Sequence, residues 1–194
     1  FNEDIKSSSL RDVDNFIVRA KLNGYRVDHS VAMNFTGGAP ATTEADIDLS
    51  ARDFAFNFWL NYSKAGNIIE HGQASSKFVV AINNAGNLVV KINDDVYTST
   101  AVVPAGKWVF MSISYSYLQG NSRLTAHYAL DASSVELFMN NLVVDYYGNG
   151  TLAVGSGLNA SMHELTMWNN AREFTVAQSE MYESKRPSTP NLIG

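Results

Sequence analysis

The clearest pattern of hydrophobic and polar positions in this chain lies between residues 105 and 117. It follows a Pro-Ala-Gly turn signal at 104–106. One parity carries apolar side chains and the other mostly serines, in the order Val109, Phe110, Met111, Ser112, Ile113, Ser114, Tyr115 and Ser116. Alternation with a period of two predicts a β-strand with one apolar and one polar face. Such a strand requires a neighbouring strand and a second layer against its apolar face.

A second alternating run, at residues 54–60, is the best partner for this strand. Phe54, Phe56, Phe58 and Leu60 share one parity, whereas Ala55, Asn57 and Trp59 share the other. Since large apolar side chains occupy every second position, we expect the phenylalanines to face the core.

Turn signals rich in Gly, Asn and Asp recur at short intervals and separate further apolar runs. Strands are expected near residues 16–22, 31–35, 45–49, 68–72, 78–82, 88–92, 96–99, 124–130, 135–139, 142–146, 151–154 and 160–168. This spacing is typical of a sandwich or barrel. A single helix is predicted at 174–184, with Thr175 as its N-cap and packed on an edge of the sandwich.

Composition fits one domain with a substantial core. The chain has 194 residues, of which 45% are hydrophobic, and it contains no cysteine. Disulfides and thiolate chemistry are therefore excluded. The net charge is −5 and the 14 Lys and Arg residues are scattered, so we expect neither nucleic-acid binding nor insertion into a membrane. The abrupt start at Phe1 favours one module of a longer multidomain or tandem-repeat protein.

Five segments carry a resemblance to a known family. They are FAFNFWL at 54–60, IIEHG at 68–72, GNL at 86–88, PAGKW at 104–108 and MHELTMWNNA at 162–171. In this order they resemble the laminin G-like, concanavalin A-like jelly-roll domain of bacterial surface and secreted proteins. The resemblance implies a sandwich of two antiparallel sheets. It does not imply one function, because this fold hosts lectins, adhesion modules and glycosidases.

Catalysis is not expected. Glu44, Asp46 and Asp48 share one parity, as the carboxylates of retaining glucanases do. They precede the strand at 54–60, however, where the family has an entry loop or edge strand, and a solvated acidic edge explains them better. The sequence contains no Gly-x-Ser-x-Gly elbow, and none of its four histidines has metal-ligand spacing to another.

Calcium is the one metal that the resemblance brings into question. Related jelly rolls often hold Ca²⁺ near the rim through carboxylates and carbonyls. Asp12, Asp14 and Glu164 are the candidate ligands. His163 stands where the family tends to place an aspartate, and its nitrogen suits calcium poorly. We therefore expect no bound metal and no other cofactor.

Glycan recognition requires aromatic rings beside planar polar groups. Trp59 with Asn57 is one candidate pair, although Trp59 could instead cover the core from outside or meet the C-terminal helix. Tyr146, Tyr147 and Asn149 form the other candidate, because adjacent tyrosines before a glycine turn can present at least one ring to solvent.

Together these patterns indicate a non-catalytic binding or adhesion module of an extracellular or cell-surface protein. It would recognise a glycan or a protein partner through loops at one rim of the sandwich. A structural spacer in a surface stalk is the alternative, and a glycoside-active enzyme is a third hypothesis.

Overall fold

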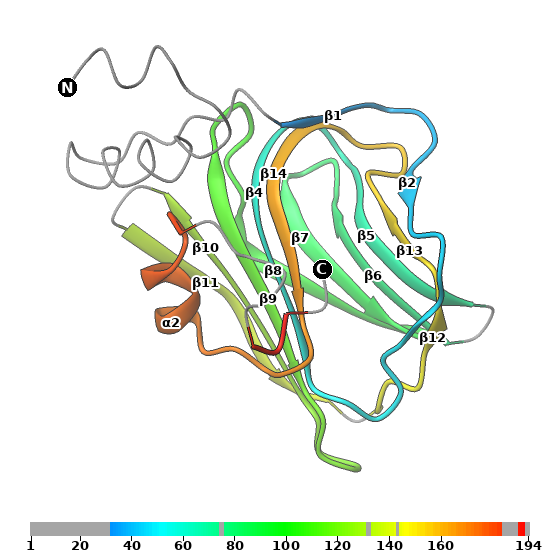
Figure 1. The fold of residues 1–194 in the computed structure, drawn as a ribbon. Coiled ribbons are helices and arrows are strands. Elements are labelled where there is room, and N and C mark those ends of the chain that lie inside the picture. The colour runs from blue at the N-terminus through cyan, green and yellow to red at the C-terminus, as the bar shows by residue number, and fades with distance from the viewer. Residues whose placement is uncertain (1–31, 74–75, 131–132, 143, 184–189, 193–194) are drawn as a thin grey trace.

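The computed structural model describes residues 32–73, 76–130, 133–142, 144–183 and 190–192. Two six-stranded antiparallel sheets stack face to face (Figure 1). Sheet A has the order β1 (Met33–Thr36), β14 (Asn159–Trp168), β4 (Phe54–Lys64), β9 (Val109–Ser116), β10 (Arg123–Leu130) and β11 (Ser133–Asn141). Sheet B has the order β2 (Ala41–Thr42), β13 (Leu152–Val154), β5 (Gly66–Gln73), β6 (Ser76–Ile82), β7 (Asn87–Ile92) and β8 (Asp95–Val102).

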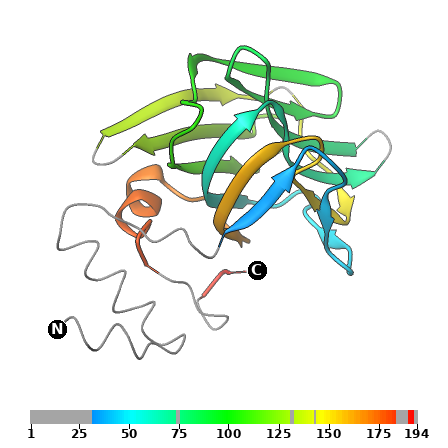
Figure 2. The ribbon, with the colours of Figure 1, turned by 90° about the horizontal axis from the view of Figure 1, so that it is seen from above.

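Two smaller elements complete the described chain. Strands β3 (Ile47–Asp48) and β12 (Asn149–Gly150) form a two-stranded sheet, and helix α2 spans Phe174–Ser179. Figure 2 shows the helix outside the sandwich, beside sheet A. The predicted jelly-roll class of two antiparallel sheets with a short C-terminal helix is therefore confirmed. The strand predicted at residues 16–22 lies outside the described residues.

The core between the sheets forms as the alternation of β4 and β9 predicted. These two strands pair antiparallel, with Phe54 opposite Tyr115 and Phe56 opposite Ile113. All four side chains are fully buried. Phe78 of β6 meets Phe54 edge to face across the sandwich, with ring centroids 5.1 Å apart. Apolar burial on this scale is the main force that holds the two sheets together.

The outer face of sheet A is also partly covered. Trp59, Phe110 and Ala129 pack there against Ala177, Met181 and Tyr182 of the C-terminal segment. The Trp59 indole Nε1 donates a hydrogen bond of 3.0 Å to the Met181 carbonyl. This second cluster explains why both faces of β4 are buried.

The helix prediction needs two corrections. Helix α2 ends at Ser179, and its N-cap is Glu173 rather than Thr175. It also packs on the outer face of sheet A rather than on an edge of the sandwich (Figure 1). The apolar patch that Trp59 and Phe110 present at the centre of this face is the physical reason, because the helix buries Ala177 against it.

Two predicted strands are shorter or absent. Of the segment at 45–49, only Ile47–Asp48 is a strand. The described part of 142–146 is irregular, because its backbone bonds to side chains and to loop backbone rather than to a sheet ladder. The Tyr146 amide, for example, donates to the Tyr115 hydroxyl at 2.8 Å.

Candidate functional site

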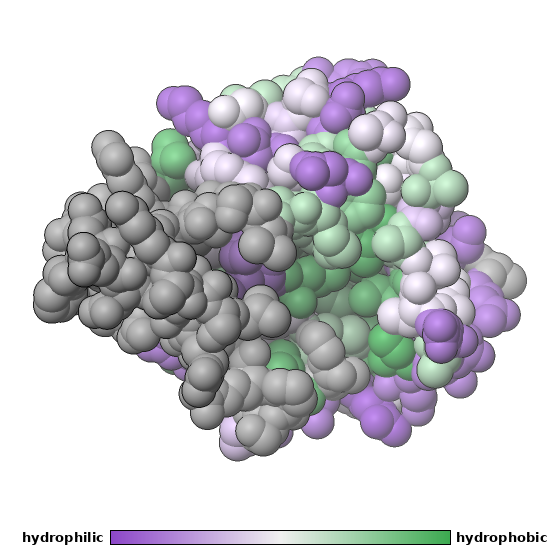
Figure 3. Space-filling view, turned by 45° about the horizontal axis from the view of Figure 1, so that its top comes forward, coloured by the Kyte–Doolittle hydropathy of each residue, from purple (hydrophilic) through white to green (hydrophobic). Residues whose placement is uncertain are grey.

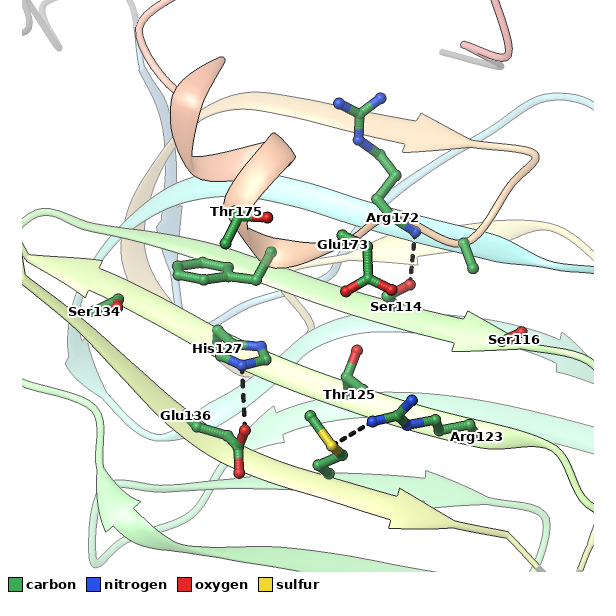
Figure 4. A pocket seen from close by; sticks show the side chains of 13 residues that line it. Ser114, Ser116, Arg123, Thr125, His127, Ser134, Glu136, Arg172, Glu173 and Thr175 are labelled. Carbon is green, nitrogen blue, oxygen red and sulfur yellow. Dashed lines mark hydrogen bonds and ion pairs between the residues drawn. The ribbon is translucent and has the colours of Figure 1, made fainter.

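A polar groove of about 520 Å³ lies on the outer face of sheet A, between strands β9 to β11 and the start of α2 (Figure 4). It is lined by Ser114, Ser116, Arg123, Thr125, His127, Ser134, Glu136, Met139, Ala171, Arg172, Glu173, Phe174 and Thr175. Ten of these thirteen residues have hydroxyl, charged or imidazole side chains, and the other three are Met139, Ala171 and Phe174. The groove therefore offers many hydrogen-bonding groups beside the apolar surfaces of Met139 and Phe174.

Strand register brings these side chains together. Each row across β9, β10 and β11 places one residue of each strand side by side: Ser114, Thr125 and Met139; Ser112, His127 and Glu136; Ser116, Arg123 and Asn141. The register shifts by one residue between Ala126 and His127. The serine side chains of β9, which alternate with its core residues, thus form the floor of the groove together with the paired side chains of β10 and β11.

His127 is held between two partners. Its Nε2 lies 3.6 Å from Glu136 Oε2. Its ring stacks on Phe174, with centroids 4.5 Å apart and planes 11° apart. Burial lowers the pKa of His127, a shift that Glu136 and Glu173 only partly oppose. At neutral pH the imidazole is therefore uncharged and offers one donor and one acceptor.

The opposite wall is the segment that leads into α2. The Arg172 amide donates to Ser114 Oγ at 2.8 Å, which fixes this segment against β9. The Arg172 guanidinium is turned away from the groove (Figure 4). It pairs with Glu180 at 2.7 Å and lies 3.8 Å from the centroid of the Trp168 ring. The Glu173 carboxylate, in contrast, is directed toward the sheet (Figure 4).

The binding residues predicted on β4 are buried. Trp59 is 5% exposed and Asn57 is 6% exposed. Trp59 lies under Met181 and Tyr182, so its ring has no free face for a ligand. The structure thus places Trp59 as the alternative interpretation described it, against the C-terminal segment.

The predicted tyrosine pair is divided between core and surface. Tyr146 is fully buried, whereas Tyr147 is 53% exposed. Asn149 is exposed on β12, opposite Asp48. The Tyr147 ring meets Tyr117 edge to face at 6.3 Å, and the contact between their hydroxyls raises the pKa of Tyr147 to about 12. Tyr147 and Asn149 remain at the rim, but Tyr146 is not available to a ligand.

Asp145 fixes the loop that carries Tyr147. Its carboxylate accepts hydrogen bonds from Ser122 Oγ at 2.5 Å and from the Gly120 amide at 2.8 Å. These bonds lower the pKa of Asp145. They also tie the loop after β9 to the loop before β12, which gives Tyr147 a rigid base.

The acidic residues do not form the predicted face. Glu44 and Asp46 lie in an exposed bend before β3, so the parity shared with Asp48 is not that of one strand. Asp48 accepts a hydrogen bond from the Ser50 amide at 3.0 Å and pairs with Arg52 at 3.1 Å. Backbone and side-chain hydrogen bonds from Ser50 lower the pKa of Asp48.

Of the candidate calcium ligands, Asp12 and Asp14 lie outside the described residues. Glu164 sits at a register shift in β14, with φ of 50°, and its Oε1 lies 3.8 Å from His163 Nε2. Within the described residues, no three His, Cys, Asp or Glu side chains are grouped so that they could hold a metal ion. The calcium prediction stays a prediction.

An apolar groove of about 320 Å³ occupies the edge where the two sheets open. It is lined by Met33, Ala41, Thr42, Thr43, Ile47, Leu152, Val154, Leu165 and Met167. Figure 3 shows hydrophobic side chains gathered in a hollow on this side of the molecule. Nothing in the sequence pattern indicated it, because its lining comes from five short or distant strand segments.

The polar groove also escaped sequence analysis. The serine parity of β9 was a signal for its floor. Its depth depends on the wall at 171–175, whose position is set by contacts with residues more than 40 positions away, such as Ser114.

No helix in the described chain combines the length and the apolar character needed to cross a membrane.

Comparison with known proteins was informative only at the level of structure. No protein-family model matches the sequence, and no curated protein sequence matches it. Among solved structures, the SAP-like pentraxin of Limulus polyphemus is 12% identical, with 80% of this chain and 83% of that chain covered and a TM-score of 0.59. A putative carbohydrate binding protein of Bacteroides ovatus is 14% identical, with coverages of 83% and 49% and a TM-score of 0.59.

Domains LG4–5 of the mouse laminin α1 chain are 15% identical, with coverages of 70% and 40% and a TM-score of 0.54. A GH54 α-L-arabinofuranosidase is also similar, with 9% identity, coverages of 78% and 40% and a TM-score of 0.56. This chain thus spans half or less of the Bacteroides, laminin and arabinofuranosidase chains. Binding proteins and a glycosidase share the architecture, so the likeness identifies the fold and not the activity. With two stacked antiparallel sheets and these structural neighbours, the chain has the laminin G-like, concanavalin A-like jelly-roll fold.

Proposed function

We propose that this chain is a non-catalytic glycan-binding module and that its ligand lies in the polar groove of sheet A. The observation that carries this proposal is the composition and rigidity of the groove. Its floor presents hydroxyls and the His127 imidazole, and the hydrogen bond from Arg172 to Ser114 fixes its wall. Sugars need many donors and acceptors in fixed positions, which such a surface supplies.

The comparisons support a binding module of this kind. The Bacteroides ovatus protein is described as a putative carbohydrate binding protein and has the same fold. The sites of two proteins that are 14% identical need not coincide, so the residues are proposed from this structure alone.

The non-catalytic part of the proposal rests on the three acidic residues that share a parity before β4. Hydrolysis of a glycosidic bond with retention uses two carboxyl groups about 5 Å apart across the bond. Glu44 and Asp46 lie in an exposed bend, and Asp48 is engaged by Ser50 and Arg52. We expect no hydrolysis of any β-glucan by the native chain, and therefore no activity that their joint replacement by amides would abolish.

The test is to fill the groove. Thr125→Arg places a long charged side chain on the floor between Ser114 and Met139. Thr98→Arg is the matched control, because Thr98 is exposed on β8 of the other sheet. We expect the native chain and Thr98→Arg to bind the same members of a glycan array and Thr125→Arg to bind none. Unchanged binding by folded Thr125→Arg would place the site elsewhere.

The rim is the second candidate site, favoured by the 53% exposure of Tyr147 on a loop that Asp145 fixes. A ring in this position can stack against a sugar. Tyr147→Ala separates the two candidates. If the rim is the site, this variant loses binding whereas Thr125→Arg keeps it.

The wider setting is proposed on the same basis. We place the module outside the cell or at its surface, as one unit of a longer chain beside neighbouring modules, with a glycan or surface protein as its partner and no resident metal. A native chain that binds no glycan on the array would instead favour the spacer hypothesis.

A further inference from the structure

We propose that the polar groove selects neutral glycans against glycans that carry carboxylate or sulfate groups, and that Glu136 and Glu173 impose this selection. The inference rests on the proposed function, since it names the ligand class of the same groove. It follows from which charges reach the groove and which are turned away from it.

Two carboxylates face the groove from opposite walls. Glu136 stands on β11 beside His127, with 54% of its side chain exposed. Glu173 is the N-cap residue of α2, but its side chain makes no capping hydrogen bond. Its carboxylate is directed toward the sheet (Figure 4). Within the described chain Glu136 contacts His127 through one oxygen and Glu173 makes no capping hydrogen bond, so carboxylate oxygens of both residues are available to a ligand.

The nearby basic groups do not neutralise them. The Arg172 guanidinium is committed to Glu180 and Trp168 outside the groove. His127 is uncharged at neutral pH, because burial lowers its pKa. Within the described chain, Glu136 has no ion pair besides its contact with His127, and Glu173 has none.

Among the described residues that line the groove, Arg123 is the remaining cation, and its Cα lies toward the other end of the groove. It is four positions before His127 on β10, about 13 Å along a strand at ~3.3 Å per residue. Its guanidinium contacts the Met139 sulfur. Met139 is paired with Thr125, two positions from His127, so the guanidinium lies nearer His127 than the Arg123 Cα does. One cation against the two carboxylates still leaves a net negative charge among the described residues that line the groove.

A ligand near His127 therefore meets two strong acceptors. Sugar hydroxyls can donate charge-assisted hydrogen bonds to them. A carboxylate or sulfate about 6 Å from one of these groups is repelled, which weakens binding roughly three- to hundredfold for effective dielectric constants of about 80 to 20. Neutral glycans are thus preferred by the same residues that exclude acidic ones.

The experiment uses the full 194-residue chain on an array of neutral glycans, each printed beside its sialylated, uronic acid or sulfated counterpart. The best neutral glycan and its acidic counterpart are then titrated by calorimetry at pH 7. The variant Glu136→Gln/Glu173→Gln removes both charges with little change of shape. Glu44→Gln/Asp46→Asn removes two charges from an exposed bend outside the groove.

We expect the native chain to bind the neutral member at least tenfold more tightly than the acidic one. The preference should fall at least fivefold in the groove variant and persist in the control, with thermal melts confirming that both are folded. Equal or tighter binding of acidic glycans by the native chain would overturn the selection and leave glycan binding intact. A preference unchanged in the folded groove variant would overturn the role of the two glutamates. If no glycan binds the native chain, the proposed function fails and this inference fails with it.

Discussion

Tyr146 and Tyr147 are adjacent in sequence, but replacement by phenylalanine should destabilise the fold only at Tyr146. The Tyr146 hydroxyl lies 2.7 Å from His71 Nδ1. His71 Nε2 lies 2.9 Å from the Ile47 carbonyl, which can only accept, so Nε2 carries the ring proton. Nδ1 is then an acceptor, and Tyr146 donates to it.

Tyr146→Phe removes that donor and leaves the buried Nδ1 without a partner. His71 is 2% exposed and Tyr146 is fully buried, so water cannot replace the lost hydroxyl without rearrangement. An unsatisfied buried acceptor costs about 1–3 kcal/mol. For a domain of 150–250 residues this corresponds to a fall in Tm of roughly 2–12 °C, at about 2–4 °C per kcal/mol.

Tyr147→Phe is the matched control. Its hydroxyl makes only long contacts, 3.4 Å to Asp145 Oδ2 and 3.5 Å to the Tyr117 hydroxyl, at the exposed rim. We expect little or no change in Tm, measured by circular dichroism at pH 7.5. A double-mutant cycle adds the second check: His71→Leu removes the ring acceptor and leaves only the carbonyl of residue 71, 3.2 Å from the Tyr146 hydroxyl, so Tyr146→Phe should cost less than in the native chain.

Two results would refute this reasoning. One is an equal effect of the two tyrosine substitutions on Tm. The other is a Tyr146→Phe cost that is unchanged when His71 is absent, because the penalty would then come from ring packing against neighbours such as Phe54 and Phe78.

Three further predictions test the core, the histidines and the metal. Phe56→Ala should destabilise the fold by about 3–5 kcal/mol in urea unfolding, because Phe56 is fully buried, and a loss below about 1 kcal/mol would contradict its place in the core. Burial lowers the pKa of both His71 and His127, so the unfolded chain takes up protons before the folded chain does as the pH falls. The free energy of unfolding should therefore be highest above about pH 6.5 and should fall on acidification toward pH 5. The decrease is at most about 1.4 kcal/mol per pH unit for each histidine. Calcium should leave the Tm unchanged. A bound ion at 100 times its dissociation constant would raise the Tm by roughly 5–10 °C. Such a rise would show a metal site if EDTA reversed it and Asp14→Asn abolished it.

Local alternation was sufficient to predict the core of this fold. The side chains at 54, 56 and 58 needed only a period of two to be assigned to one buried face, and β4 and β9 pair as expected. The segment at 142–146 shows where the method stops. Its apolar residues suggested a strand, but the hydroxyls of Tyr115 and Ser122 bind its backbone and Asp145 instead, and no local pattern encodes these distant partners.

The binding candidates on β4 are buried for a related reason. Trp59 has the alternation of a residue that points away from the core, and it does so. Whether such a ring meets solvent depends on what covers the outer face, and here that is a segment more than 110 residues later in the chain, with Met181 as its hydrogen-bond partner. The exposure of Tyr147 was easier to anticipate, because adjacent tyrosines before a glycine turn can present at least one ring to solvent. The structure adds that Gly148 leaves room for the Tyr146 ring, since a Cβ at that glycine would collide with it.

The outer face of sheet A has an apolar region and a polar region at opposite ends of β9. At the end of β9 that carries Phe110, the face is apolar and anchors α2, whereas at the end that carries Ser114 and Ser116 it is polar and forms the groove. The stack of Phe174 on His127 lies where these regions meet. Because Phe174 is the first residue of α2 and also lines the groove, the contact that seats the helix sets the width of the groove. Docking of the C-terminal segment is therefore a condition for the groove to exist.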